Sequence, residues 1–284
     1  MSLLGRAAVL GLGLALFGLA GCEDTPQVHW DPLGIPGRDG GAPALTMSAV
    51  MHIADASRQA GDYGNAVNLY RHAATMEPRN PDPLVGLGAA LLEMGKVDEA
   101  ILNYKAALKL SEHDGDALRG LVRAYLKTGR PDLTGGPLAV AYQDTPNDPK
   151  LLLLLGVADD FLGQHAAAQV RYRQGLQYAP ADHSLLLDLA LSLALSEKYD
   201  DAIGVLRPIA LGATATPQER QTLALIYGLK GDEKAARDLA RIDLDPASVD
   251  HNIAYYDSLR RLSADARSRA IMSASAAPRV PPQS

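Results

Sequence analysis

The sequence has little of what usually supplies covalent cross-links or reactive groups: it holds one cysteine, one tryptophan and two phenylalanines in 284 residues. A single cysteine excludes an internal disulfide, so stability has to come from packing. The seven histidines are scattered, and none stands at metal-ligand spacing from the cysteine or from a cluster of carboxylates, so we expect no metal site. A formal net charge of −6 disfavours binding to nucleic acid.

Motifs for catalysis and for cofactors are lacking too. The sequence contains no Gly-x-Ser-x-Gly elbow and no phosphate-binding loop. Residues Gly86 and Gly88 resemble a fragment of a dinucleotide loop, but they lie within a predicted helix with no strand before it, so close helix packing is the better interpretation. We therefore predict a protein that is not an enzyme, with no catalytic residue, no cofactor and no small-molecule substrate.

What the sequence does contain is a period of 34 residues that runs from residue 47 to residue 250 without a gap. The six blocks begin at Met47, Pro81, Gly115, Pro149, His183 and Pro217. The eighth position is small in five of the six blocks, with the residues Ala54, Gly88, Val122, Gly156, Ala190 and Ala224. The twentieth position is small in five blocks as well, with Ala66, Ala100, Thr134, Ala168, Ala202 and Ala236. Small residues at two fixed positions let two helices cross closely.

A period of 34 residues is that of the tetratricopeptide repeat, a hairpin of two antiparallel helices. The turn between the two helices carries a glycine in every block but the fifth, where Glu197 replaces it. The seventh position holds a large apolar residue in every block, beginning with Ile53, and is expected to be buried between hairpins. We therefore predict an all-α fold, a right-handed superhelical solenoid of six tetratricopeptide hairpins over residues 47–250 with a C-terminal capping helix.

Two blocks are expected to deviate locally. In the third block, prolines and glycines in residues 131–137 stand where the second helix should begin, so we expect this helix to start late, near Pro137. In the fifth block, Pro208 stands near the end of the second helix, and a loop over residues 212–216 replaces a tight turn. That helix should end early or kink.

The N-terminus is typical of a bacterial lipoprotein. One charge, Arg6, precedes a short apolar run that ends in Leu-Ala-Gly and then Cys22. We predict a signal peptide over residues 1–21, acylation of Cys22 and a flexible tether over residues 22–46; the alternative is an ordinary signal sequence with a free cysteine. Glu23 stands where aspartate often retains lipoproteins at the inner membrane, so the outer membrane, facing the periplasm, is favoured.

The first helix of each hairpin lines the concave face of such a solenoid, which is its usual binding surface. At the positions that point into this groove, we expect an apolar stripe of Leu153, Val157, Leu187, Leu191 and Leu225. The basic pair Arg119 and Arg123 lies beside the stripe. This surface suits an amphipathic helix or an extended peptide of a protein partner. The alternative is that tight curvature or the C-terminal segment of the chain itself buries these leucines.

At its C-terminal end the chain stops looking like a generic repeat. Residues 216–225 and the segment Asn252-Ile253-Ala254-Tyr255-Tyr256-Asp257-Ser258-Leu259-Arg260 resemble the TadD family, the tetratricopeptide lipoproteins of the tight-adherence (Tad) system, which assembles Flp pili. The resemblance implies a non-enzymatic, pilotin-like assembly factor at the outer membrane, with the pilus secretin or another Tad component as its partner. We expect a capping helix over residues 251–271 and a disordered tail over residues 272–284.

Two other functions remain open at this point. The protein could be a tetratricopeptide lipoprotein that serves outer-membrane barrel assembly or recruits a peptidoglycan hydrolase. A more remote alternative, from a different class, is a hydrolase that acts on the cell wall.

Overall fold

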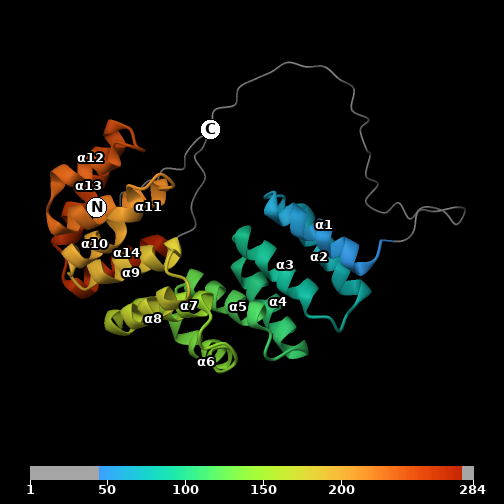
Figure 1. Ribbon diagram of the computed structural model, residues 1–284. Helices are drawn as coiled ribbons and strands as arrows, with labels where there is room; N and C mark the ends of the chain where they lie inside the picture. The colour runs from blue at the N-terminus through green and yellow to red at the C-terminus, as the bar shows by residue number, and fades with distance from the viewer. Residues whose placement is uncertain (1–44, 277–284) are drawn as a thin grey trace, which may run out of the picture.

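The structure is a computed structural model that describes residues 45–276, all of them in helices or in the turns between helices (Figure 1). Six consecutive hairpins are formed by α1 Met47–Gln59 with α2 Tyr63–Met76, α3 Asp82–Glu93 with α4 Val97–Leu110, α5 Gly115–Lys127 with α6 Gly135–Asp144, α7 Pro149–Phe161 with α8 His165–Tyr178, α9 His183–Leu195 with α10 Tyr199–Ala210, and α11 Pro217–Lys230 with α12 Glu233–Ala240. Two more helices follow, α13 Pro246–Arg260 and α14 Ala264–Ala276. The predicted all-α fold of six hairpins and a cap is confirmed.

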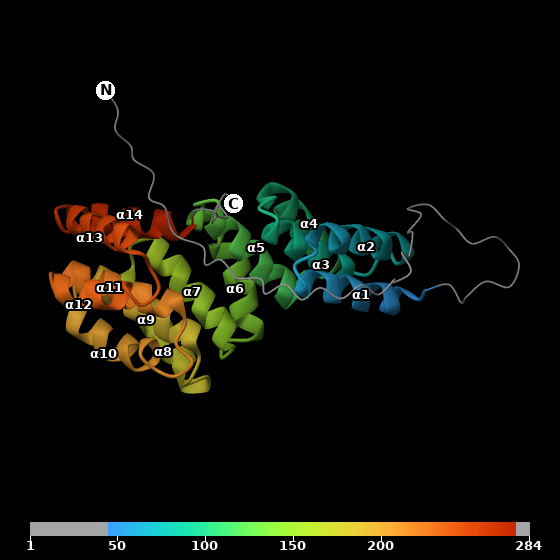
Figure 2. The ribbon, with the colours of Figure 1, turned by 90° about the horizontal axis from the view of Figure 1, so that it is seen from above.

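The hairpins stack in chain order. Each helix packs on the next along the chain, and the first helix of each hairpin also contacts the first helix of the following one. In the C-terminal half, α7, α9 and α11 lie between the second helices on one side and the pair α13 and α14 on the other (Figure 2). No helix within residues 45–276 combines the length and the apolar character needed to cross a membrane.

Local sequence explains where the helices begin and end. An aspartate side chain caps the N-terminus of six helices by accepting a hydrogen bond from a backbone N–H of the first turn. These caps are Asp62, Asp114, Asp148, Asp182, Asp232 and Asp245. Between the helices of a hairpin, the turn glycines have φ between 68° and 93°, and Glu197 takes φ 60° at the same position. The turn is therefore left-handed in all six hairpins, glycine or not.

Both predicted local deviations are confirmed. In the third hairpin a 3-10 turn, Pro131–Leu133, replaces the first turn of the second helix, and α6 begins at Gly135, two residues before Pro137. In the fifth hairpin, α10 contains Pro208 and ends after 12 residues, whereas α2, α4 and α8 each have 14. The prolines act as expected because each removes a backbone donor and restricts φ.

The C-terminal predictions need correction. The expected single cap over residues 251–271 is two helices, because residues 261–263 interrupt it between α13 and α14. The boundary of the expected disordered tail, residue 272, falls inside α14, where Ile271 and Met272 are buried. Several predicted features lie outside the described residues: the signal peptide, Cys22, nearly all of the tether, and residues 277–284.

One core prediction is wrong as well. Ile53 was expected to be buried at the seventh position, but it is 43% exposed, whereas Leu155 at this position is half-buried and Leu87, Leu121, Leu189 and Leu223 are buried. The physical reason is its place in the stack. Ile53 belongs to the first hairpin, and the described chain has no earlier hairpin that could pack against it.

Tyrosine rings set the distance between the helices. The ring of Tyr172 on α8 lies so close to Gly156 on α7 that a β-carbon added to Gly156 would overlap it. The ring of Tyr104 on α4 stands in the same relation to Gly88 on α3 and to Gly120 on α5, the first helix of the next hairpin. Each tyrosine thus packs within its own hairpin, against the next one, or both, and the facing residue has to be small.

We expect Gly156→Ala to lower the free energy of unfolding by about 1–3 kcal/mol, because the added methyl group forces the Tyr172 ring out of its site. Urea denaturation measures this change. The matched control is Gly204→Ala in α10, where nothing lies within 4 Å of an added β-carbon. This control should leave stability unchanged or raise it by up to about 1 kcal/mol. Equal effects of the two substitutions would contradict the packing argument.

Candidate protein-binding groove

The predicted apolar stripe comes together on three consecutive first helices, α7, α9 and α11. Leu153, Val157 and Leu187 are half-buried and pack on the core of the C-terminal half. Leu191 and Leu225, also half-buried, pack against a buried cluster to which α14 contributes Ile271 and Met272. The chain's own C-terminal helix therefore covers this end of the groove.

The basic pair lies one hairpin earlier, on α5, and acidic side chains accompany both arginines. Arg119 forms ion pairs with Asp116 at 2.6 Å and with Asp148 at 3.1 Å. Arg123 faces Glu93 of α3 at 3.7 Å, and its side chain is 60% exposed. Of the two, Arg123 is the more available to a partner.

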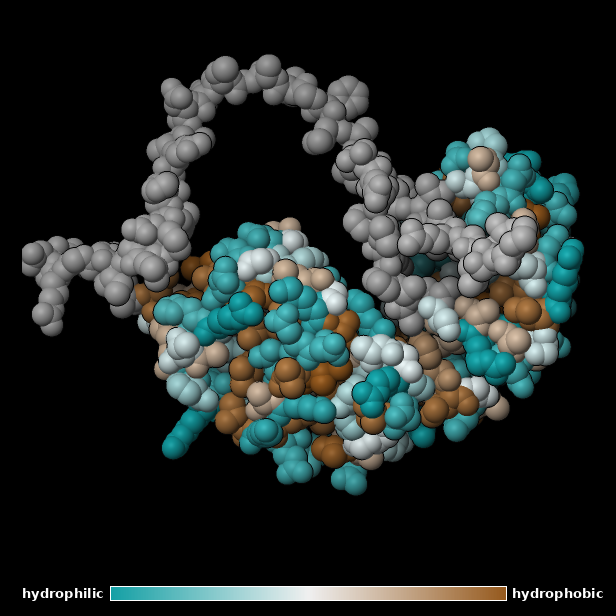
Figure 3. Space-filling view, turned by 180° about the vertical axis from the view of Figure 1, so that it is seen from behind, coloured by the Kyte–Doolittle hydropathy of each residue, from teal (hydrophilic) through white to brown (hydrophobic). Residues whose placement is uncertain are grey.

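The apolar side chains with the largest exposed fractions lie far apart in the sequence. Figure 3 shows one face of the molecule, on which hydrophobic residues are interspersed with hydrophilic ones. The most exposed large apolar side chains are Leu102, Val170 and Ile242, and they belong to three different hairpins. Single exposed apolar residues of this kind are normal on a soluble surface.

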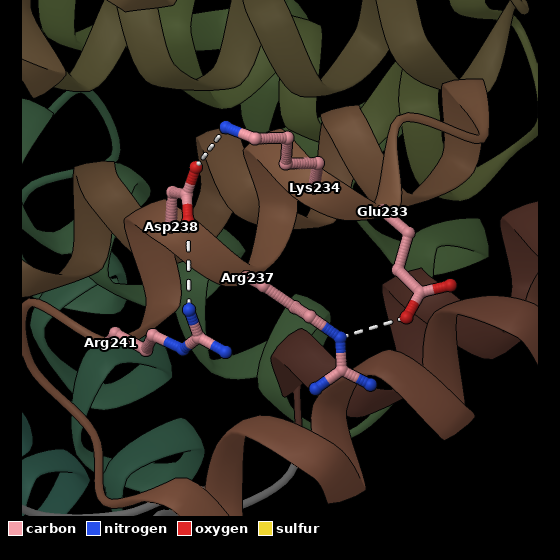
Figure 4. A pocket seen from close by; sticks show the side chains of 5 residues that line it. All are labelled: Glu233, Lys234, Arg237, Asp238 and Arg241. Carbon is pink, nitrogen blue, oxygen red and sulfur yellow. Dashed lines mark hydrogen bonds and ion pairs between the residues drawn. The ribbon is translucent and has the colours of Figure 1, made fainter.

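A pocket at α12 is lined by charged side chains that already pair with one another. Glu233, Lys234, Arg237, Asp238 and Arg241 line it (Figure 4). These side chains pair with one another along one helix, Lys234 with Asp238 at 2.9 Å and Arg237 with Glu233 at 2.8 Å. Such exposed pairs at helical spacing describe a solvated helix face.

Sequence reasoning missed the polar contacts that hold α14 in the groove. Arg267, 8% exposed, donates to the backbone carbonyls of Leu259 and Leu262, to the carboxylate of Glu197 at 2.8 Å and to the hydroxyl of Tyr199 at 2.9 Å. The only signal in the sequence was Glu197 itself, the residue that departs from the turn glycine. Its side chain is what reaches Arg267.

A second contact joins Ser268 of α14 to a buried carboxylate. Ser268 Oγ lies 3.1 Å from His165 Nε2, and His165 Nδ1 lies 2.7 Å from Asp160 Oδ1. Asp160 also accepts hydrogen bonds from Ser192 at 2.7 Å and from Tyr172 at 2.9 Å. The position of Asp160 in the repeat directs it toward the groove. Its hydrogen bonds hold it inside a network that links α7, α8, α9 and α14.

The order serine, histidine and aspartate matches that of a hydrolase triad, but the surroundings do not fit acyl transfer. Ser268 is 8% exposed and lies within α14, where the helix itself uses the nearby backbone N–H groups. An oxyanion hole needs such donors free and aimed at the reacting oxygen. The contact fits a structural link between α14 and the groove.

One acidic residue in the groove region is strongly perturbed. Burial, and to a smaller extent the nearby carboxylates of Asp160 and Asp182, raise the pKa of the Asp188 carboxyl on α9 to about 7. Among the described residues, no cation lies within ion-pair distance of Asp188. At neutral pH its charge therefore destabilises the fold.

The comparisons with known proteins agree with this architecture. The family model described as tetratricopeptide repeat matches residues 57–102 and 91–133. The fold is a tetratricopeptide-repeat solenoid. Pseudomonas aeruginosa pilF resembles it with a TM-score of 0.61 and 18% identity over 74% of this chain and 97% of that chain. PilW, described as a widely conserved type IV pilus biogenesis factor, has a TM-score of 0.63 and 16% identity over 68% and 90% of the two chains.

Similarity in sequence extends beyond pilus proteins. Anaphase-promoting complex subunit 7 from Homo sapiens is 26% identical over 147 residues, which is 51% of this tetratricopeptide chain and 26% of that protein. The chain thus spans about a quarter of that relative's length. At these identities the solved structures show the shared fold alone, and the partner of this solenoid is a matter for a proposal.

We expect Asp188→Asn to raise the free energy of unfolding by about 1–3 kcal/mol at pH 8, because the folded-state pKa lies above the ordinary value of about 3.9. The penalty for ionising Asp188 is absent below about pH 4, grows as the pH rises toward 7 and is complete above it. The gain of the variant should shrink accordingly toward pH 4 when urea denaturation is repeated across this range.

The matched control is Asp132→Asn, at an exposed aspartate of the 3-10 turn. It should change stability by less than about 0.5 kcal/mol at every pH. If Asp188→Asn raises the free energy of unfolding by the same amount at every pH, the burial of the Asp188 charge is not the cause of the stabilisation.

Proposed function

We propose that this protein is a lipid-anchored, protein-binding assembly factor at the periplasmic face of the outer membrane, and that it acts as a pilotin-like factor for the secretin of the Flp/Tad pilus. The observation that carries the proposal is the order of parts along the chain. A sequence typical of a lipoprotein box ends at Cys22, and a solenoid of six tetratricopeptide hairpins begins at Met47. With a lipid on Cys22, this order would join a protein-binding surface to a membrane anchor.

The segment that resembles the TadD family supports the same proposal. Its two parts lie in α11 and α13, on either side of α12. Thr216 and Glu219 form a capping box at the start of α11, and Arg220 pairs with Asp243 beyond α12. Tyr256 of α13 lies where a β-carbon on Gly228 of α11 would overlap its ring. The residues of the resemblance are therefore the ones that form the last hairpin and its cap.

The physical basis of the role is concentration and not catalysis. Acyl chains on Cys22 would hold the protein at the membrane, since each buried methylene contributes about 0.8 kcal/mol. A tether of about 23 residues has a root-mean-square reach of roughly 25–30 Å. A secretin segment bound to the solenoid would then be confined near the membrane at a raised effective concentration, which favours insertion and assembly.

We expect Cys22→Ser to move the protein from the membrane fraction to the soluble periplasmic fraction, because the thiol that accepts the lipid is gone. Cell fractionation and metabolic labelling with a fatty-acid analogue measure the two consequences. Cys22 is the only cysteine, so any thioether-linked label in the wild-type chain reports this site. Membrane attachment that survives the substitution would refute the anchor.

A second experiment tests the partner. The full-length lipoprotein, isolated from detergent-solubilised native membranes, should co-purify with the pilus secretin or another Tad component, identified by mass spectrometry. The Cys22→Ser variant serves as the control and should recover less of the secretin, because the two proteins no longer share a membrane. Recovery of barrel-assembly factors or cell-wall hydrolases without a secretin would replace this proposal with an adaptor role in those systems.

A further inference from the structure

Helix α14 does not continue the stack. Each first helix from α1 to α13 contacts its immediate neighbours in the solenoid, whereas α14 turns back to lie on α7 and α9 (Figure 2). Its polar contacts span long stretches of chain: Arg267 and Glu197 are 70 residues apart, and Ser268 and His165 are 103 residues apart. The helix therefore lies across first helices of the solenoid, which is the side where the sequence predicts that a partner binds.

One face of α14 makes all of these contacts. Arg267 and Ser268 stand one turn before Ile271 and Met272, which is the spacing of neighbours on a helix surface. The two apolar side chains are buried with Leu195 of α9, Leu229 of α11 and Leu259 of α13. Arg269, on the opposite side of α14, is exposed.

The groove carries groups that serve this contact and are not needed for stacking hairpins. Glu197 holds a left-handed backbone, which is unfavourable for a residue with a β-carbon, at a turn where the other five hairpins use glycine. Its carboxylate is the partner of Arg267. His165, oriented by Asp160, presents its other ring nitrogen to Ser268. The surface that contacts α14 thus combines a charged group, a hydrogen-bonding imidazole and buried apolar side chains.

We propose that this surface, formed by α7, α9 and the ends of α10, α11 and α13, is a helix-binding site that α14 fills within the same chain. The partner that takes its place is an amphipathic helix with the pattern of α14, an arginine and a hydroxyl residue followed one turn later by two large apolar residues. The inference rests on the proposed protein-binding function but does not require the partner to be a pilus component.

The short connection between α13 and α14 determines how easily a partner helix can displace α14. Only residues 261–263 separate the two helices, so α14 is present at its site at an effective concentration in the millimolar range or above. A free helix of the same sequence competes poorly with it. A partner has to bind more tightly or be concentrated beside the solenoid, as a protein held at the same membrane would be.

The probe for this site is a fluorescein-labelled synthetic peptide of residues 261–276, with binding to the full-length chain followed by anisotropy. Arg267→Ala removes the four hydrogen bonds of the guanidinium and should release α14, so this variant should bind the peptide at least about 10-fold more tightly than the wild-type chain does. Arg269→Ala, the matched control on the same helix, should bind it as weakly as the wild-type chain. Equal binding by all three chains would overturn the proposal.

Hydrogen exchange on the wild-type chain gives an independent test that does not rely on a variant. The amides of α14 should exchange by a local opening that leaves α9 and α13 protected, since a displaceable helix must leave without unfolding the stack. If α14 exchanges only together with α9, it is an integral part of the fold and the proposal is wrong. Neither assay involves a pilus protein, so a failure to co-purify a secretin would remove the pilus role and leave this site in place.

Discussion

The close contact between a tyrosine ring on the second helix and a small residue on a first helix is the constraint on which the rest of the solenoid depends. Tyr104 and Tyr172 show it most clearly, because the glycines that face them have no room for a β-carbon. The contact sets the spacing between helices and so the way in which each hairpin is placed on the next. At the position of these tyrosines the third hairpin has Leu138, which belongs to a separate core cluster, and the fifth has Leu206, which lies within the large C-terminal cluster.

The stacking of the hairpins determines which side chains line the groove. Bringing α7, α9 and α11 together aligns apolar residues that are far apart in the sequence, and at Leu191 and Leu225 the structure covers them with α14. The covering helix is held by a buried arginine and by a hydrogen-bond network centred on Asp160, not by apolar contact alone. Directional contacts of this kind specify one docked position, because a shifted helix would leave Arg267 buried without its acceptors.

The same arrangement bears on what the protein does. A solenoid whose first helices carry a docked helix of the same chain has the parts of a protein-binding surface. The residues that resemble the TadD family lie in α11 and α13, and the ends of these two helices contribute Leu229 and Leu259 to the cluster that contains Ile271. Family resemblance and the candidate binding site thus involve the same end of the molecule.

The sequence by itself determined the hairpins, the left-handed turns, the late start of α6 and the early end of α10, because each depends on residues close together in the chain and recurs with a period of 34. The apolar stripe lies on α7, α9 and α11, and its role in binding stays a prediction. Only the tertiary structure decided that α14 folds back, that Glu197 meets Arg267 and that part of the stripe is covered. Contacts between residues 70 or 103 positions apart occur once, so they leave no period in the sequence from which they could have been predicted.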